Sequence, residues 1–313
     1  MDKCLLIGNG LNRCLEHSIE WGELLREIAV DYGVDYNGDI PMPMEFERIA
    51  NQIFEKQQTP TPKLYLEIKS KVVEKIKRTK LPDNAIHKEL TKLKVDVIMT
   101  TNYDYLLEYV FNKDFSYRGE SKKYYFEKTS VQQGIDFYHL HGMVNSKQSL
   151  CLGYEHYAGI VQKLREKFNT KEKNCASEMR IKKILYGEEE RHDTWGERFY
   201  TSDIDIIGLN LTESEMDLWW LLMHRAYLYY SNYEGVKKHL KNTIVFHDII
   251  EEPRKTDDEV EKRKKIAICR EKKNRQMMLR KANIHVEPYM IRDNEEYCDV
   301  YREIIKNIKE KEN

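Results

Sequence analysis

The sequence lacks the paired cysteines that hold structural zinc in proteins. Its six cysteines are spread over 313 residues, at positions 4, 14, 151, 175, 269 and 298, and no two of them form a C-x-x-C pair. Structural zinc sites draw their ligands from such pairs. His139 and His141 have no third ligand nearby in the sequence. We therefore expect neither a zinc module nor another metal site.

Long apolar runs and an excess of one charge are also missing. The most hydrophobic stretch, DLWWLLM, is about a third of the roughly 20 residues that cross a bilayer. The 52 basic and 53 acidic residues nearly cancel, so the chain offers no general field for polyanions. We expect a soluble protein with no membrane partner and no direct nucleic-acid partner. The first expected strand leaves no room for a secretory signal, which predicts a cytoplasmic location.

Six short apolar, β-branched runs recur along the chain, and each ends in small or polar residues. Helical stretches such as DYLLEYVFNK and EMDLWWLLMHRAYLYY separate them. This alternation predicts an α/β fold with a Rossmann-like, doubly wound and largely parallel sheet. The expected strands are 4–10, 95–102, 135–142, 203–210, 242–248 and 283–289.

Two stretches depart from simple alternation. Residues 18–93 contain several helix-like segments and no convincing strand, which predicts an inserted helical layer or subdomain. Residues 155–198 are polar and are expected to form a second helical insertion, and a charged helical part begins at about residue 251. We expect a single domain over 1–313. Charge crowds into 163–198 and 251–281, which are expected to be solvated helices, with interaction surfaces as the alternative.

Gly8 and Gly10 follow the first expected strand. Glycines there permit a tight turn and a close approach of backbone N–H groups to a phosphate. The usual G-x-G-x-x-G fingerprint needs a third glycine at position 13, which is Arg13, and a second strand ending in an acidic residue within about 30 residues. Both are absent, which disfavours a hydride-transfer dehydrogenase. An ordinary strand-to-helix turn remains an alternative.

Polar residues follow four of the expected strands, in GNGLN, TTNYD, HLHG and GLNLTESE. Open parallel sheets bind ligands beyond the carboxyl ends of their strands. Strand alternation places Asn102 with Asp104, and His139 with His141, so that one pocket could gather them. Singly, Asn102 and Asp104 could cap the next helix, and either histidine could be a core residue. The four strand ends together favour a ligand site.

In this order, LLIGNGLN, TTNYD, HLHG and IIGLNLTESEMDLWWLL resemble the sirtuin-like domains of bacterial antiphage defence effectors, which bind NAD and often hydrolyse it. The resemblance spans roughly residues 1–250 and includes WGELL at 21–25. The abortive-infection H-type family shares the GNG, TTNY and HG elements and is the near alternative. Deacetylating sirtuins carry a zinc module with two C-x-x-C pairs, and the absence of these pairs here disfavours peptide deacylation.

The resemblance implies an NAD hydrolase that releases nicotinamide and ADP-ribose and depletes NAD in abortive infection. By this likeness Asn102 is expected to orient the attacking water, Asp104 to bond the nicotinamide amide, and His141 to act as a general base. The expected cofactor-binding residues are Gly8, Asn9 and Gly10 at the diphosphate, Asn12 at a ribose or the leaving group, Thr101, and Gly208 and Asn210 at the adenosine half.

A second hypothesis is a catalytically silent subunit that binds NAD or ADP-ribose and assembles with a partner such as a motor ATPase. A homo-oligomer is also expected. The aromatic stretch LWWLLMHRAYLYYSNY could bury a subunit contact, although core packing is the favoured interpretation. A cell-killing enzyme of this kind is expected to stay silent until a trigger or a partner defence protein activates it.

Overall fold

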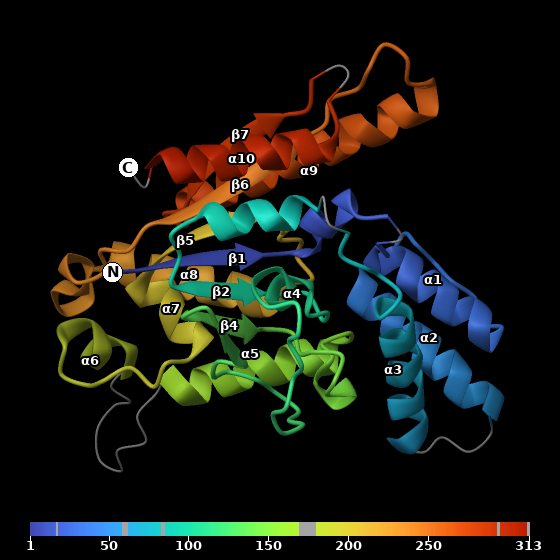
Figure 1. The fold of residues 1–313 in the computed structure, drawn as a ribbon, viewed down its shortest axis with the longest axis horizontal. Coiled ribbons are helices and arrows are strands. Elements are labelled where there is room, and N and C mark those ends of the chain that lie inside the picture. Colours follow the sequence, from blue (N-terminus) through green and yellow to red (C-terminus); the bar gives the residue numbers. More distant parts are fainter. Residues whose placement is uncertain (17, 58–61, 83–84, 169–179, 293–294, 312–313) are drawn as a thin grey trace.

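The centre of the molecule is one seven-stranded sheet in the order β3-β4-β2-β1-β5-β6-β7 (Figure 1). The computed structural model describes residues 1–16, 18–57, 62–82, 85–168, 180–292 and 295–311. All neighbouring strands pair in parallel except β3, which runs antiparallel to β4. The strands are β1 (Asp2–Ile7), β2 (Val97–Thr100), β3 (Ser130–Gln132), β4 (Ile135–His139), β5 (Ser202–Ile207), β6 (Ile244–Ile250) and β7 (His285–Met290).

The predicted Rossmann-like α/β fold is confirmed, and each of the six expected strands corresponds to an observed one. From β1 the chain adds β2 and β4 on one side and later β5, β6 and β7 on the other. The boundary between β1 and β5 is therefore a topological switch point, the place where open α/β sheets bind ligands. The short strand β3 was missed because three residues are too few to show an alternation.

Helices cover both faces of the sheet, because its strands are apolar on both sides. Along β1, Cys4 and Leu6 join one core cluster, whereas Leu5 and Ile7 join another. Burial on both faces is typical of parallel sheets. The first cluster draws on α5 (Tyr154–Phe168), α6 (Arg180–Tyr186), α7 (Trp195–Thr201), α8 (Met216–Ser231) and α9 (Glu259–Lys281), and the second on α4 (Leu106–Phe111), α10 (Tyr297–Lys311) and the 3-10 helix Ile86–Lys92.

The helices expected within 18–93 form a layer beyond the carboxyl ends of the strands (Figure 1). These are α1 (Trp21–Tyr32), α2 (Met42–Gln57) and α3 (Pro62–Ile76). They enclose a core of their own, in which Ile28, Phe46 and Ile68 are fully buried. Met143, from the loop after β4, packs into the same core and fixes the layer to the sheet.

The described part of 155–198 is helical as expected, but it covers the sheet and is not an outlying insertion. Tyr157 and Leu164 of α5 and Trp195 near the end of this region are fully buried in the first core cluster. Residues 169–179, which belong to the charged segment 163–198, lie outside the described residues. Within the described parts of the chain, no helix combines the length and the apolar character needed to span a membrane.

Gly208, the residue after β5, is required both by its conformation and by its surroundings. Its φ is +66°, and a Cβ there would lie 2.9 Å from the backbone nitrogen of Leu11. We expect Gly208→Ala to lower the free energy of unfolding by about 2–4 kcal/mol in urea denaturation. Gly187 has a φ of +74° but open space around it, so Gly187→Ala should cost only about 1 kcal/mol. Equal losses of unfolding free energy in the two variants would show that the close approach of Gly208 to Leu11 adds nothing to the cost of the substitution.

Candidate functional site

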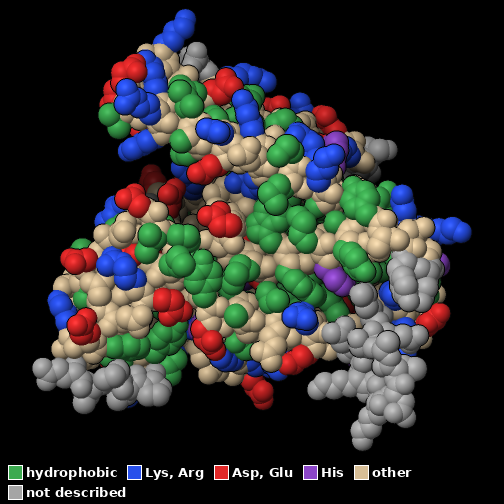
Figure 2. Space-filling view, turned by 180° about the vertical axis from the view of Figure 1, so that it is seen from behind, with side chains coloured by type: hydrophobic (Ala, Val, Ile, Leu, Met, Phe, Trp, Pro, Cys, Tyr) green, Lys and Arg blue, Asp and Glu red, His purple; other side chains and the backbone are tan. Residues whose placement is uncertain are grey.

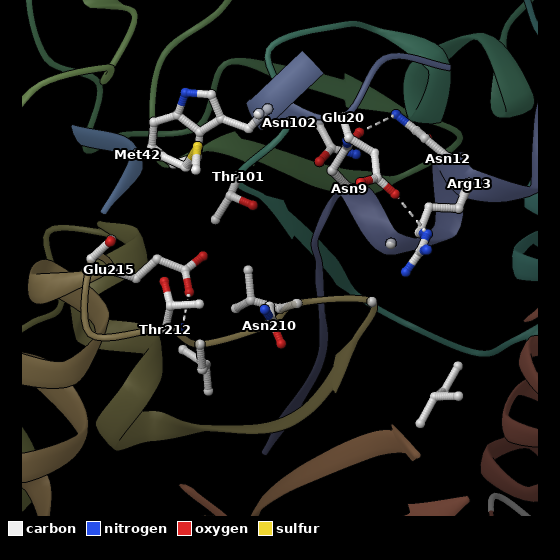
Figure 3. Close-up of a pocket in the computed structure, with 18 of the residues that line it drawn as sticks. Asn9, Asn12, Arg13, Glu20, Met42, Thr101, Asn102, Asn210, Thr212 and Glu215 are labelled. Carbon is white, nitrogen blue, oxygen red and sulfur yellow. Dashed lines mark hydrogen bonds and ion pairs between the residues drawn. The ribbon is translucent and has the colours of Figure 1, made fainter. Parts of the chain in front are cut away.

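A cleft of about 1400 Å³ lies at the carboxyl ends of β1, β2, β5 and β6. Its walls come from these strand ends, from Trp21 and Met42 of the helical layer, and from Lys272 and Arg275 of α9. Figure 2 shows it as a hollow below the lobe that contains α9. Nine of the ten predicted site residues line it, namely Asn9, Gly10, Asn12, Thr101, Asn102, Asp104, His141, Gly208 and Asn210, whereas Gly8 does not. Figure 3 labels five of the nine: Asn9, Asn12, Thr101, Asn102 and Asn210.

Asn102 has a fixed backbone and an unpaired side chain. Its N–H donates to Thr100 Oγ1 at 3.0 Å, and its carbonyl oxygen lies 2.9 Å from His139 Nδ1. The side chain lines the cleft, yet the residue is only 5% exposed, and neither Oδ1 nor Nδ2 has a hydrogen-bond partner among the described residues. A buried polar group without a partner costs about 1–3 kcal/mol. This amide is therefore placed to bond a ligand.

His139 does not line the cleft, so the prediction that it shares a pocket with His141 is wrong. The strand β4 ends at His139, and strand alternation therefore does not extend to position 141. The His139 ring is buried, and its Nε2 lies 3.0 Å from Glu108 Oε1. Burial opposes protonation, but the Glu108 carboxylate outweighs it and raises the pKa of His139. Through His139 Nδ1, this pair of side chains holds the backbone carbonyl group of Asn102 in place.

His141 lies in the cleft and is paired with a carboxylate from a distant element. Its Nε2 is 3.0 Å from Asp217 Oδ2, and both side chains are buried. Burial opposes protonation of the ring, but Asp217 and, to a smaller extent, Glu215 together outweigh it and raise the pKa of His141. Asp217 lies in the first turn of α8, where the helix dipole stabilises negative charge. With Nε2–H donated to Asp217, Nδ1 keeps its lone pair and can accept a proton.

Glu215, immediately before α8, is an acidic residue that lines the cleft. Its Oε2 accepts a hydrogen bond from the Thr212 N–H at 2.9 Å (Figure 3). Burial raises the pKa of Glu215 to about 7, although the nearby His141 opposes the shift. The carboxyl group can therefore exchange a proton near neutral pH. Glu215 and Asp217 were missed, although the acidic residues of TESEMD, just before an apolar helix, are a usable signal.

The raised pKa of Glu215 predicts a pH-dependent stability. The group is protonated in both states below the unfolded pKa of about 4.3, and ionised in both above the folded pKa of about 7. The cost of its buried charge thus grows as the pH rises through this window. We expect Glu215→Gln to raise the melting temperature at pH 8 and to leave it nearly unchanged at pH 4. A control, Glu213→Gln at the exposed neighbour, should change it little at either pH. An equal rise in the melting temperature of Glu215→Gln at both pH values would contradict the raised pKa of Glu215.

Asn12 and Asp104 bond each other, which leaves them fewer free atoms for a ligand than predicted. Asn12 Nδ2 donates to Asp104 Oδ2 at 3.1 Å and to Asn9 Oδ1 at 2.9 Å. Asn12 Oδ1 lies 2.8 Å from His87 Nε2. Asp104 Oδ1 accepts the Leu106 N–H at 3.0 Å, as the helix-capping alternative anticipated. Through this bond the two residues join residues 8–13, which we call the glycine loop, to the segment that follows β2. They thereby hold Asn9 beside Asn102 (Figure 3).

The glycine loop packs tightly against β5, which corrects part of the predicted diphosphate site. The Gly8 N–H donates to Ile207 O at 3.0 Å, and the Gly10 N–H donates to Gly208 O at 2.8 Å. A Cβ on Gly8 would lie 2.5 Å from Gly208 O. These two glycines are required for close backbone packing, and their amides are already engaged. Of the three amides expected at the diphosphate, that of Asn9 remains.

Asn210 meets the charged helix α9 at the far end of the cleft. Its Oδ1 accepts a hydrogen bond from Arg275 Nη1 at 3.1 Å, and Arg275 Nη2 also bonds Asp248 Oδ1 at 3.2 Å. Lys272 lines the same end of the cleft. The sequence indicated a solvated helix over 251–281, and nothing in it linked that helix to Asn210. The structure places one face of it in the site.

No group of three or more His, Cys, Asp and Glu side chains able to hold a metal ion occurs among the described residues. Residues 96–183 match the family model of the SIR2-like domain. This range contains β2 and β4 together with Asn102 and His141, so the sirtuin-like resemblance is confirmed for the part of the sheet that carries them. SIR2-like domains are in general NAD-dependent enzymes. No curated protein matches the chain.

Proposed function

We propose that this protein hydrolyses NAD at the bond between nicotinamide and ribose and releases nicotinamide and ADP-ribose. The observation that carries the proposal is the unpaired, buried amide of Asn102 in a cleft at the carboxyl ends of a parallel sheet. His141, which lines the same cleft and is paired with Asp217, supports it. The SIR2-like match over 96–183 supports NAD as the substrate.

The reaction adds water across a carbon–nitrogen bond. Nicotinamide leaves with the bonding electron pair, positive charge develops on the ribose, the water oxygen bonds the ribose carbon, and one proton is released. The Asn102 amide both donates and accepts hydrogen bonds, so it can orient the water or a ribose hydroxyl without trapping the cation. His141 Nδ1 accepts the proton as a general base. Asp217, a positioning residue, stabilises the resulting imidazolium.

The charge of the cleft suits this transition state. Glu215 and Asp217 are carboxyl groups close to His141. Carboxylates that the fold already holds in position stabilise a developing cation, and they do so most strongly in a site that excludes water. Trp21, Trp219 and Trp220 line the same cleft. Their apolar rings give the nicotinamide a surface on which to pack.

The proposal is tested with purified protein, NAD and chromatographic detection of nicotinamide. We expect the wild type to release nicotinamide under activating conditions, and we expect His141→Ala to slow the release by more than about tenfold. If the wild type is active and neither His141→Ala nor Asn102→Ala slows it by at least about tenfold, the assigned roles are wrong. Tight NAD binding without release, even with a partner protein present, would favour the silent subunit instead.

We further propose that NAD depletion by this protein serves antiphage defence in the cytoplasm, in a homo-oligomer or together with a partner such as a motor ATPase. The support is the resemblance of four motifs along the chain to those of such effectors. Infected cells that produce the wild type should lose NAD, whereas cells that produce the Asn102→Ala variant should keep it. Equal NAD levels in both would count against this role.

A further inference from the structure

Four cationic side chains line the cleft away from Asn102, and the proposed hydrolysis does not use them. One of them, Lys265, is paired with Glu251 and Asp257. We call Arg13, Lys272 and Arg275 the cation cluster. The side chains of Lys272 and Arg275 are 15% and 10% exposed. Arg13 comes from the glycine loop, and its guanidinium lies 4.3 Å from the centre of the Tyr297 ring. The cluster therefore draws one side chain from the 3-10 helix Asn9–Cys14 and two from α9.

Arg275 keeps hydrogen-bonding capacity in a nearly buried position. Of its five N–H groups, one bonds Asn210 and another bonds Asp248. Its Nε is buried and has no hydrogen-bond partner among the described residues. A buried guanidinium with unused donors is a costly arrangement unless an anion completes it.

Asp248 lies near the end of β6, on the side of the sheet where we place the adenosine half of a dinucleotide. Dinucleotide-binding folds commonly use a carboxylate to bond the adenosine ribose hydroxyls. Asp248 is only 4% exposed, and both of its oxygens are engaged: Oδ1 by Arg275, and Oδ2 by Gln276 Nε2 at 2.8 Å. A ribose there would find Asp248 already engaged by Arg275 and Gln276.

Acidic side chains also line the cleft, among them Glu251, Glu261 and Glu271, but Asp248 is the one that pairs with Lys272 and Arg275. Lys272 Nζ is 4.0 Å from Asp248 Oδ1, so Asp248 is shared between Lys272 and Arg275. Arg13 pairs with Glu20 at 2.9 Å, and both of these side chains are largely exposed, which weakens the pair. Burial lowers the pKa of Lys272, and Arg275 and Arg13 lower it further against the effect of Asp248. One buried carboxylate, that of Asp248, is thus shared by two cations of the cluster.

We propose that the cation cluster binds a phosphate on the 2′ oxygen of the adenosine ribose, so that the protein accepts NADP in preference to NAD. This inference rests on the proposed function, because it assumes that a dinucleotide lies across the cleft. The sheet order places Asn102 at β2 and Arg275 beside β5 and β6, on opposite sides of β1. An arginine accommodates the 2′-phosphate in NADP sites, and its planar fork bonds phosphate oxygens in pairs.

The test uses isothermal titration calorimetry on the full chain with ADP-ribose and with 2′-phospho-ADP-ribose. Neither compound contains the bond that is cleaved, so binding needs no activation. We expect the wild type to bind the 2′-phosphorylated compound at least about tenfold more tightly. Arg275→Gln should reduce this ratio to below about twofold and leave the affinity for ADP-ribose within about threefold. Arg270→Gln, at an exposed position of α9 outside the cleft, should keep the wild-type ratio.

Two further variants guard against a loss of structure at Arg275. Arg275→Lys keeps the positive charge but loses the planar guanidinium group. We expect its ratio of affinities for the two compounds to lie between those of the wild type and Arg275→Gln. Asp248→Asn removes the competing carboxylate charge, so the preference for the 2′-phosphorylated compound should be kept or increased.

Equal affinity of the wild type for both compounds overturns this inference and leaves the proposed function standing. An equal loss for both compounds in Arg275→Gln assigns the cluster to the diphosphate, which also overturns it. If the wild type binds neither compound, the proposed function fails as well.

Discussion

Replacing Asn102 with alanine should slow nicotinamide release by at least about hundredfold while leaving the fold intact. Removing one preorganised hydrogen-bonding group from a catalytic site typically costs about 10²–10³ in rate. The backbone of Asn102 is held by Thr100 and His139 through main-chain atoms, and these bonds remain in the variant. Its side chain has no partner to lose among the described residues. Stability should therefore be unchanged or higher by about 1 kcal/mol, because an unsatisfied buried amide is removed.

The measurement pairs initial rates of nicotinamide release with thermal unfolding of the same preparations. Asn51→Ala is the matched control, because Asn51 is exposed on α2 and does not line the cleft. The control should keep the wild-type rate. A rate within about threefold of wild type in Asn102→Ala would remove Asn102 from the mechanism, and a large loss of stability would show that its amide has a structural partner.

Replacing Asp217 with asparagine should lower kcat/KM by at least about hundredfold and shift its pH dependence. Asp217 raises the pKa of His141, whereas burial of the ring lowers it. Without the carboxylate, burial dominates and the pKa of His141 falls. A general base works only when it is deprotonated, so activity is lost as the pH falls through its pKa. The acid limb of the profile should therefore lie at lower pH in the variant than in the wild type.

The profile of kcat/KM is measured from about pH 5 to about pH 9, a range that covers the titration of a shifted histidine. Asp114→Asn, at an exposed position outside the cleft, serves as the control and should leave both the rate and the limb unchanged. An acid limb that stays in place or moves to higher pH in Asp217→Asn would show that His141 is not the base. A merely structural role of Asp217 would lower the rate without moving the limb.

The strands could be predicted because a parallel sheet buried on both faces leaves continuous apolar runs such as CLLI and VDVIM. Their ends were set too late. The strands β1 and β2 end at Ile7 and Thr100, and the polar residues beyond them belong to the loops that form the site. The helices within 155–198 were interpreted as an insertion because charge dominates the composition, although Tyr157 and Leu164 bury one face of α5.

Asn102 and His141 could be found because each is the second residue after a strand, and parallel strands bring their carboxyl ends together. His139 was misassigned because the chain leaves the strand after it. Asp217 and Arg275 could not be linked to the site by spacing alone. Asp217 reaches His141 from 76 positions away, and Arg275 reaches Asn210 from 65 positions away. Only the packing of α8 and α9 against the sheet brings these pairs together.

The most direct test of the central claim is nicotinamide and ADP-ribose release from NAD by the purified wild type and the Asn102→Ala variant, measured for each protein alone and with the products of the neighbouring genes added. The account predicts equal amounts of both products from the wild type in at least one of these conditions, and loss of both products in the variant. NAD that binds tightly in the cleft and stays intact in every condition would contradict hydrolysis and leave a nucleotide-binding subunit.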